Sequence, residues 1–311
     1  MKLAFVFPGQ GSQAIGMMNG FAGHPIVRET FDEASKALGD DLWKLVDEGP
    51  AEALNLTTNT QPVMLTAGVA VYRAWLASGG AKPGVMAGHS LGEYTALVAS
   101  GALAFADAVP LVRFRAQAMQ DAVPAGVGAM AAIMGGEDDA IAAACQEAAQ
   151  GQVVEPVNFN APGQIVIAGH REAVERAIAL AKQKGAKRGV LLPVSAPFHS
   201  SLLKPAAEKL AARLAQVNFI TPSIPVIHNV DVAEHATPDA IRAALAQQAA
   251  SPVRWTATVQ RMVELGVTHV VECGPGRVLA GMNRRIAEGI ESYALIDSDA
   301  VNETLAALRG A

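Results

Sequence analysis

The sequence predicts an α/β fold with a large α/β-hydrolase-like domain, built on a parallel sheet and interrupted by a small ferredoxin-like subdomain. Leu3–Phe7 is a continuous apolar run ended by Pro8-Gly9, which is typical of a parallel strand buried on both faces. Similar short runs alternate with helical patterns in the first and last parts of the chain. Between them the order changes to βαββαβ, the order of a ferredoxin-like unit.

The domain organisation that follows is discontinuous. We expect residues 1–126 and 196–311 to form the large catalytic domain and residues 127–195 to form the small subdomain. A chain of 311 residues is long enough for two such units. Because ligand sites favour the interface between domains, a cleft at this junction is the expected place for a site.

In the large domain, helices and strands are assigned from apolar periodicity and from turn residues at their ends. Asn59 is expected to cap one helix, Gly79-Gly80 to end it, and Asp107 to cap another. Helices are expected over 26–38, 43–54, 59–76, 93–99, 107–123, 202–214, 239–248, 254–265 and from Val278, and strands over 3–7, 85–87, 225–229, 269–273 and 293–296.

The small subdomain is expected to contain four strands and two helices. The strands are predicted over 129–134, 153–159, 164–168 and 189–194, and the helices over 138–149 and 171–184. The second helix leads into a basic cluster, Lys182, Lys184, Lys187 and Arg188. Most such runs are solvated faces or helix C-terminal charges, and a docking surface for an acidic partner is the more specific interpretation.

Composition narrows the class of protein. The chain is 51% hydrophobic and 17% charged with a net charge of -5, which indicates a globular protein and no nucleic-acid footprint. Its two cysteines, Cys145 and Cys273, fit buried thiols in a reducing compartment, and no cysteine pair has metal-ligand spacing. No apolar run is long enough to span a membrane or to form a signal peptide, so we expect a soluble cytoplasmic protein.

The most informative motif is Gly88-His89-Ser90-Leu91-Gly92, which lies between a predicted strand and a predicted helix. A Gly-x-Ser-x-Gly at such a junction is the pattern of a nucleophile elbow, in which the serine occupies a strained turn. The N-terminus of the following helix favours an oxyanion beside the serine. Taken alone, the pattern fits an ordinary tight turn equally well.

A second glycine-rich loop follows the first strand. Gly9-x-Gly11-x-x-Ala14 loosely matches the dinucleotide fingerprint. The second strand that such a site needs, ending in an acidic residue about 20 residues on, is replaced by a helical pattern. A nucleotide site is therefore disfavoured, and the alternative is a loop that turns backbone N–H groups toward another ligand.

Arg115 lies within the predicted helix 107–123, and its neighbours three and four positions away are all apolar. An arginine on an apolar arc does not stay buried without a partner. It either extends its guanidinium to solvent or pairs with an internal carboxylate, or its partner arrives with a substrate.

Several motifs occur together in one order: residues 5–13, Thr60-Gln61-Pro62, residues 88–94, Arg115, His199 and Gly274-Pro275-Gly276. In these motifs, over nearly its full length, the chain resembles the malonyl-CoA:acyl-carrier-protein transacylases of bacterial type II fatty-acid synthesis. The resemblance extends to the acyltransferase domains of polyketide synthases.

The resemblance implies a role for each matching residue. Ser90 matches the nucleophile and His199 its base, although the residues alone do not select His199 from the other histidines. The backbone N–H groups of Gln10 and Leu91 match the oxyanion hole. Arg115 matches the residue that holds the malonyl carboxylate.

The remaining implied roles concern the surroundings of this dyad. Gln248 matches a glutamine whose backbone carbonyl orients the histidine. No acidic third member stands out between the serine and the histidine in the sequence, and the resemblance implies a dyad. Phe198 precedes the histidine, where a bulky side chain favours malonyl over methylmalonyl groups. The residues expected near substrate are Gln10, His89, Arg115, Phe198 and Asn160.

The function implied is a ping-pong transfer of malonyl from malonyl-CoA to the phosphopantetheine thiol of acyl carrier protein, through a malonyl-serine ester. The resemblance implies no cofactor and no metal. We expect a monomer whose basic cluster at 182–188 binds the carrier protein. Two alternatives stay open: a hydrolase that uses the same elbow, and a carrier-protein-binding scaffold without activity. The same residues would also serve a polyketide pathway.

Overall fold

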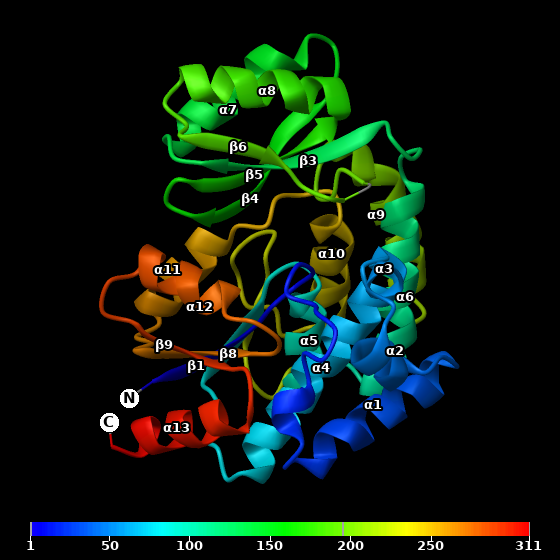
Figure 1. Cartoon of the computed structure of the whole chain (residues 1–311), viewed down its shortest axis with the longest axis vertical. Coiled ribbons are helices and arrows are strands. Elements are labelled where there is room, and N and C mark those ends of the chain that lie inside the picture. Colours follow the sequence, from blue (N-terminus) through cyan, green and yellow to red (C-terminus); the bar gives the residue numbers. More distant parts are fainter. Residues whose placement is uncertain (1, 195, 311) are drawn as a thin grey trace.

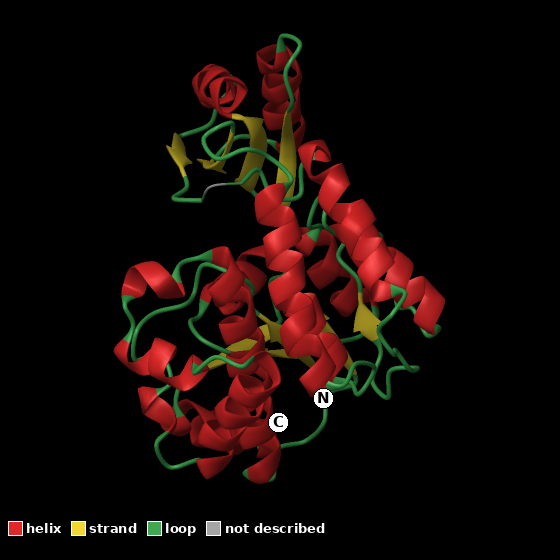
Figure 2. Ribbon diagram, turned by 90° about the vertical axis from the view of Figure 1, so that its right-hand side faces the viewer, coloured by secondary structure: helices red, strands yellow, loops and turns green. Residues whose placement is uncertain are grey.

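The computed structural model describes residues 2–194 and 196–310. Two units are stacked along the long axis of the molecule, the larger around one sheet and the smaller around another (Figures 1 and 2). The predicted combination of a parallel sheet with a separate small antiparallel sheet is confirmed. The exact boundaries at 126 and 196 stay predictions, and Ser195, the last residue of the predicted subdomain, lies outside the described residues.

The large sheet has five parallel strands in the order β7-β2-β1-β8-β9. The strands are β1 (Leu3–Phe7), β2 (Val85–Gly88), β7 (Val226–Ile227), β8 (His269–Cys273) and β9 (Glu291–Leu295). The register pairs Phe7 with Gly88, so the loop after β1 and the elbow after β2 leave the sheet side by side. Ligand sites favour this carboxyl edge of a parallel sheet.

The helices of the large unit are α1 (Pro25–Leu38), α2 (Leu42–Glu48), α3 (Ala51–Leu54), α4 (Thr57–Ala77), α5 (Gly92–Ala99), α6 (Phe105–Asp121), α9 (Lys204–Leu214), α10 (Pro238–Gln248), α11 (Trp255–Glu264), α12 (Val278–Ile286) and α13 (Ser298–Arg309). Two short 3₁₀ turns, Asn19–Phe21 and Ser201–Leu203, complete the set described. α4 is buried along most of its length, which explains why its apolar residues are not confined to one face.

Several predicted elements differ from the structure. The single helix expected over 43–54 is two helices, because Gly49-Pro50 interrupts it. Asn59 and Asp107 do not cap their helices: the caps are Leu56 and Ala104, and both predicted residues lie in the first turn. The C-terminal helix α13 was not predicted.

The small unit contains β3 (Gly128–Met134), α7 (Asp138–Ala149), β4 (Val154–Ala161), β5 (Gln164–His170), α8 (Arg171–Gln183) and β6 (Arg188–Leu191). Its antiparallel sheet has the order β4-β5-β3-β6, and both helices cover one face (Figure 1). The last strand ends at Leu191 rather than at residue 194 as predicted. Residues 192–194 instead line the cavity described below.

The two units are joined by an apolar cluster that places the site. Met119 of α6, Met130 of β3 and Phe198 pack together in it, so the cluster draws on both units and on the segment that returns from the small one. Among the described residues, no helix is long and apolar enough to cross a membrane.

Candidate active site

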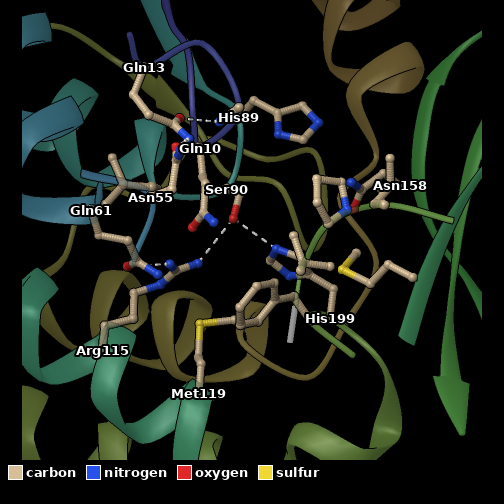
Figure 3. A pocket seen from close by; sticks show the side chains of 17 residues that line it. Gln10, Gln13, Asn55, Gln61, His89, Ser90, Arg115, Met119, Asn158 and His199 are labelled. Atoms are coloured by element: carbon tan, nitrogen blue, oxygen red, sulfur yellow. Dashed lines mark hydrogen bonds between the residues drawn. The ribbon is translucent and has the colours of Figure 1, made fainter. Parts of the chain in front are cut away.

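A cavity of about 510 Å³ opens at the carboxyl edge of the large sheet. Its walls come from the loop after β1, the elbow after β2, helix α6, residues 192–194 and residues 198–199 (Figure 3). Both polar and apolar side chains line the cavity. The polar lining includes Gln10, Gln13, Asn55, Gln61, His89, Ser90, Arg115, Asn158 and His199, and the apolar lining includes Met119, Met130, Leu192, Pro193, Val194 and Phe198.

The elbow has the strained geometry that its sequence predicts. Ser90 has φ 52°, in the left-handed region that non-glycine residues rarely adopt. The flanking glycines allow the strand and helix to approach closely. A Cβ on Gly88 would lie 1.9 Å from the Gly92 carbonyl carbon, and one on Gly92 would lie 2.0 Å from the Phe7 carbonyl oxygen. No larger side chain fits at either position.

Ser90 and His199, which are 109 residues apart in sequence, meet at this elbow. The distance from Ser90 Oγ to His199 Nε2 is 2.8 Å (Figure 3). His199 Nδ1 lies 2.9 Å from the Gln248 backbone carbonyl, which can only accept, so Nδ1 carries the proton and Nε2 is free to accept from the serine. This is the arrangement of a nucleophile, a base and an orienting group.

The electrostatic environment keeps His199 uncharged at rest. Only 4% of the residue is exposed, and burial together with the positive charge of Arg115 lowers the pKa of His199 to about 3. Its hydrogen bond to Gln248 acts in the opposite direction. At neutral pH the imidazole is therefore a proton acceptor.

Arg115 projects from α6 into the same cavity and is 1% exposed. It donates to Gln61 Oε1 at 2.7 Å, to Gln248 Oε1 at 2.9 Å and to Ser90 Oγ at 3.1 Å. All these acceptors are neutral, and no carboxylate among the described residues forms an ion pair with it. Burial lowers the pKa of the guanidinium. The internal carboxylate that sequence analysis left open as a partner is therefore not in contact.

Two backbone N–H groups border the serine. Gln10 follows β1 and Leu91 follows Ser90, and both residues line the cavity. Neither N–H donates to an acceptor among the described residues, whereas the side chain of Gln10 is tied to Thr57 Oγ1 at 3.3 Å. Because buried N–H groups are normally paired, two free ones at a cavity wall mark a place for an oxygen of a ligand.

The other predicted residues lie around this centre. His89 Nε2 is 2.8 Å from Asn160 Oδ1, and burial lowers the pKa of His89. Phe198 is nearly buried and forms part of the apolar wall. Asn160 is held against His89 and is not part of the cavity lining, whereas Asn158 of the same strand is.

Sequence analysis did not single out three polar residues that support the site. Gln61 was noted within a motif but given no role, and it accepts from Arg115. Glu93 and Asn229 form a buried layer under the elbow. Glu93 directly follows the Gly-x-Ser-x-Gly motif, so its position was a usable signal, whereas nothing local marks Asn229. No group of three or more potential metal ligands occurs within residues 2–194 and 196–310.

Comparison with known proteins shows the family to which the chain belongs. Residues 4–306 match the family described as acyl transferase domain. The chain belongs to the acyl transferase family. The malonyl CoA-acyl carrier protein transacylase of Escherichia coli strain K12 is 57% identical to this acyl transferase over 305 residues, which cover 98% of this chain and 99% of that protein.

Solved structures resemble the acyl transferase equally closely. An acyl-carrier-protein S-malonyltransferase from Burkholderia pseudomallei 1710b superposes with a TM-score of 0.97 at 61% identity, covering 98% of this chain and all of that one. A malonyl-transacylase in complex with its type II PKS acyl-carrier protein superposes with a TM-score of 0.97 at 51% identity, covering 99% of this chain and 100% of that one.

Proposed function

We propose that this acyl transferase moves malonyl from malonyl-CoA to the phosphopantetheine thiol of acyl carrier protein, supplying extender units for fatty-acid biosynthesis. The observation that carries the proposal is the buried Arg115, whose guanidinium lies 3.1 Å from Ser90 Oγ without a carboxylate partner among the described residues. A guanidinium grips a carboxylate through two parallel hydrogen bonds. The distal carboxylate of a malonyl group supplies the missing partner within reach of the nucleophile.

In the first half-reaction, Ser90 Oγ attacks the thioester carbonyl as its proton passes to His199 Nε2. The carbonyl oxygen becomes an oxyanion and accepts from the N–H groups of Gln10 and Leu91. The carbon–sulfur bond then breaks, and the His199 proton goes to the sulfur of CoA. The product is a malonyl-Ser90 ester and free CoA thiol.

In the second half-reaction, the carrier-protein thiol gives its proton to His199 and its sulfur attacks the ester carbonyl. The same oxyanion donors serve again. Ser90 recovers a proton from His199 as the ester bond breaks, which returns the enzyme to its starting state. Gln248 keeps the imidazole in the required tautomer throughout.

We propose that the enzyme is a monomer, that it acts in the cytoplasm and that its protein partner is an acyl carrier protein. The basic cluster Lys182, Lys184, Lys187 and Arg188 is exposed at the end of α8 and the start of β6, where an acidic carrier protein has access to it. Lys184 already pairs with Glu147 at 3.0 Å, which leaves the other three as the proposed contacts. Lys187→Glu should raise KM for the carrier protein and leave acylation by malonyl-CoA unchanged, and an unchanged KM would remove the cluster from this role.

The central experiment is mass spectrometry of the intact protein after mixing with malonyl-CoA. The expected result is one malonyl adduct that maps to Ser90, disappears in Ser90→Ala and is discharged by the thiol of holo acyl carrier protein. If Ser90→Ala still carries the adduct, the proposed nucleophile is wrong. If the adduct decays equally fast in buffer and with carrier protein, the enzyme is a hydrolase.

A further inference from the structure

Glu93, in the first turn of α5, is a completely buried carboxylate beneath the elbow. Oε1 accepts from His228 Nδ1 at 2.7 Å, and Oε2 accepts from the Asn229 backbone N–H at 2.8 Å and from Gln248 Nε2 at 3.1 Å. The Asn229 N–H and the Gln248 NH₂ can only donate, and His228 donates in the tautomer that has its proton on Nδ1. A buried carboxylate is tolerated when donors surround it, so the ionised form of Glu93 matches this environment.

Asn229 connects Glu93 to the nucleophile through hydrogen bonds. Its Oδ1 accepts from the Ser90 backbone N–H at 2.8 Å, and its Nδ2 donates to the Gly88 carbonyl at 2.7 Å. The amide therefore holds the backbone on both sides of His89. These two bonds help to hold Ser90 at its positive φ, a conformation that persists only where its surroundings impose it.

Gln248 connects Glu93 to the base and to Arg115 through hydrogen bonds. Its backbone carbonyl accepts from His199, its Oε1 accepts from Arg115, and its Nε2 donates both to Glu93 and to the Ser90 carbonyl at 3.0 Å. Reversing this amide would place its NH₂ against the guanidinium and its oxygen against the carboxylate. The charge on Glu93 thus fixes which way the Gln248 amide points.

We propose that Glu93 is the positioning residue of this site, which holds the serine through Asn229 and the histidine and arginine through Gln248. The proposal deepens the proposed function and rests on it. The carboxylate of a catalytic triad contacts its histidine directly, whereas Glu93 lies one glutamine away. Its negative charge also offsets that of Arg115 without pairing with it, which leaves the guanidinium open to a substrate carboxylate.

The charged and titratable groups around these residues set the expected pH effect. Removing the Glu93 charge leaves Arg115 less compensated, so His199 becomes harder to protonate and its pKa falls further. The groups that face His199 are Arg115 and His89, and those that face Glu93 are His228, Arg115 and Tyr94.

The test is rapid-mixing acylation of Glu93→Gln by malonyl-CoA across pH. The amide that replaces the carboxylate removes the negative charge and one of the two acceptor oxygens, which weakens the network. The rate constant should fall about 100-fold, the order expected for a small misplacement of reacting groups. The amplitude should stay at one malonyl per chain, and the acid limb of the pH profile should move to lower pH.

A purely structural Glu93 would give a different pattern: a lower amplitude or melting temperature, with an unmoved rate constant and acid limb. That pattern, or wild-type behaviour, would overturn the proposal. If wild-type enzyme itself is not acylated by malonyl-CoA, the proposed function fails instead, so the two failures are distinguishable.

Two variants of His228 test the same network without changing Glu93. His228→Asn keeps a side-chain N–H near the position of Nδ1, whereas His228→Leu removes this donor from Glu93. We expect His228→Asn to acylate within about threefold of wild type and His228→Leu to lose at least roughly tenfold, both at full amplitude. Equal rates in the two variants would contradict the proposal even if Glu93→Gln did not fold.

Discussion

Arg115 Nη2 donates to the Oγ of Ser90 at 3.1 Å, so the residue proposed to bind the substrate carboxylate contacts the proposed nucleophile before substrate arrives. The same Oγ lies 2.8 Å from the base. A substrate carboxylate must therefore draw the guanidinium to itself, which links recognition of the acyl group to the state of the serine.

Arg115→Ala should lower kcat/KM for malonyl-CoA by at least about 100-fold and change that for acetyl-CoA far less, because the malonyl group has a free distal carboxylate and the acetyl group has none. Arg113 is a matched control on the same helix: it is partly exposed and pairs with Asp40 at 2.9 Å. Arg113→Ala should change kcat/KM for malonyl-CoA and for acetyl-CoA by no more than about twofold. Equal losses for malonyl and acetyl transfer in Arg115→Ala would exclude the specificity role.

The pH dependence should differ between free and substrate-bound enzyme. The positive charge of Arg115 helps to lower the pKa of His199 to about 3 in the free protein. A bound malonyl carboxylate offsets that charge, so the pKa of His199 rises in the complex. The acid limb of kcat, which reports the complex, should therefore lie at higher pH than that of kcat/KM, which reports the free enzyme.

Acetyl-CoA provides the control for this pH effect. It brings no carboxylate, so its two acid limbs should lie at the same pH. If the malonyl limbs also coincide, substrate does not tune the base through Arg115.

Phe198→Ala should widen the acyl specificity. The ring is nearly buried and forms part of the apolar wall beside the dyad. Its removal opens space for an α-methyl group, and one methyl in an apolar pocket changes discrimination roughly 10- to 200-fold. Competition between methylmalonyl-CoA and malonyl-CoA measures the ratio, and an unchanged ratio would show that Phe198 does not face the α-carbon.

The sequence predicted those parts of the fold and site that have local causes. The periodicity of apolar residues and the turn residues beside them predicted β1, β8 and α7 at their observed positions. The spacing of Gly88, Ser90 and Gly92 predicted the elbow. The caps at Asn59 and Asp107 were predicted wrongly: the helices begin at Thr57 and Phe105, so both predicted residues lie in the first turn.

Long-range polar contacts could not be read from local patterns. Glu93 and Asn229 are 136 residues apart, and only the folded chain shows that the carboxylate of one accepts from the backbone of the other. Resemblance to a family suggested the role of His199. The geometry places its Nε2 beside the serine, which the residues alone did not predict.

Because strand and helix approach closely at the elbow, two glycine-to-alanine substitutions should have opposite effects on stability. A Cβ on Gly92 would lie 2.0 Å from the Phe7 carbonyl oxygen, whereas a Cβ on Gly281, within α12, meets nothing within 4 Å. Gly92→Ala should lose acylation and melt at lower temperature. Gly281→Ala should gain up to about 1 kcal/mol, since alanine is the better helix former. Thermal unfolding of both, with the acylation amplitude, checks the pair, and an active Gly92→Ala would refute the close approach.

Glu272 should make the stability fall as pH rises from about 4.5 to about 7. Its side chain is buried at the N-terminus of α12, Oε2 accepts from the Ala280 N–H at 2.7 Å, and Oε1 has no partner among the described residues. Burial raises the pKa of Glu272 from 4.5 to about 7. The folded state therefore binds the proton more tightly than the unfolded state, and the cost of ionisation develops between about pH 4.5 and 7.

Glu272→Gln removes this titration and keeps an oxygen for Ala280. The shift from 4.5 to about 7 corresponds to a cost on the order of 3 kcal/mol above pH 7. We expect the variant to be more stable than wild type at about pH 8, and to lose most of that advantage at about pH 5, where Glu272 is protonated in the folded protein. Denaturant unfolding at the two pH values measures the difference. A constant difference between variant and wild type would show that the Glu272 carboxyl does not titrate in this range.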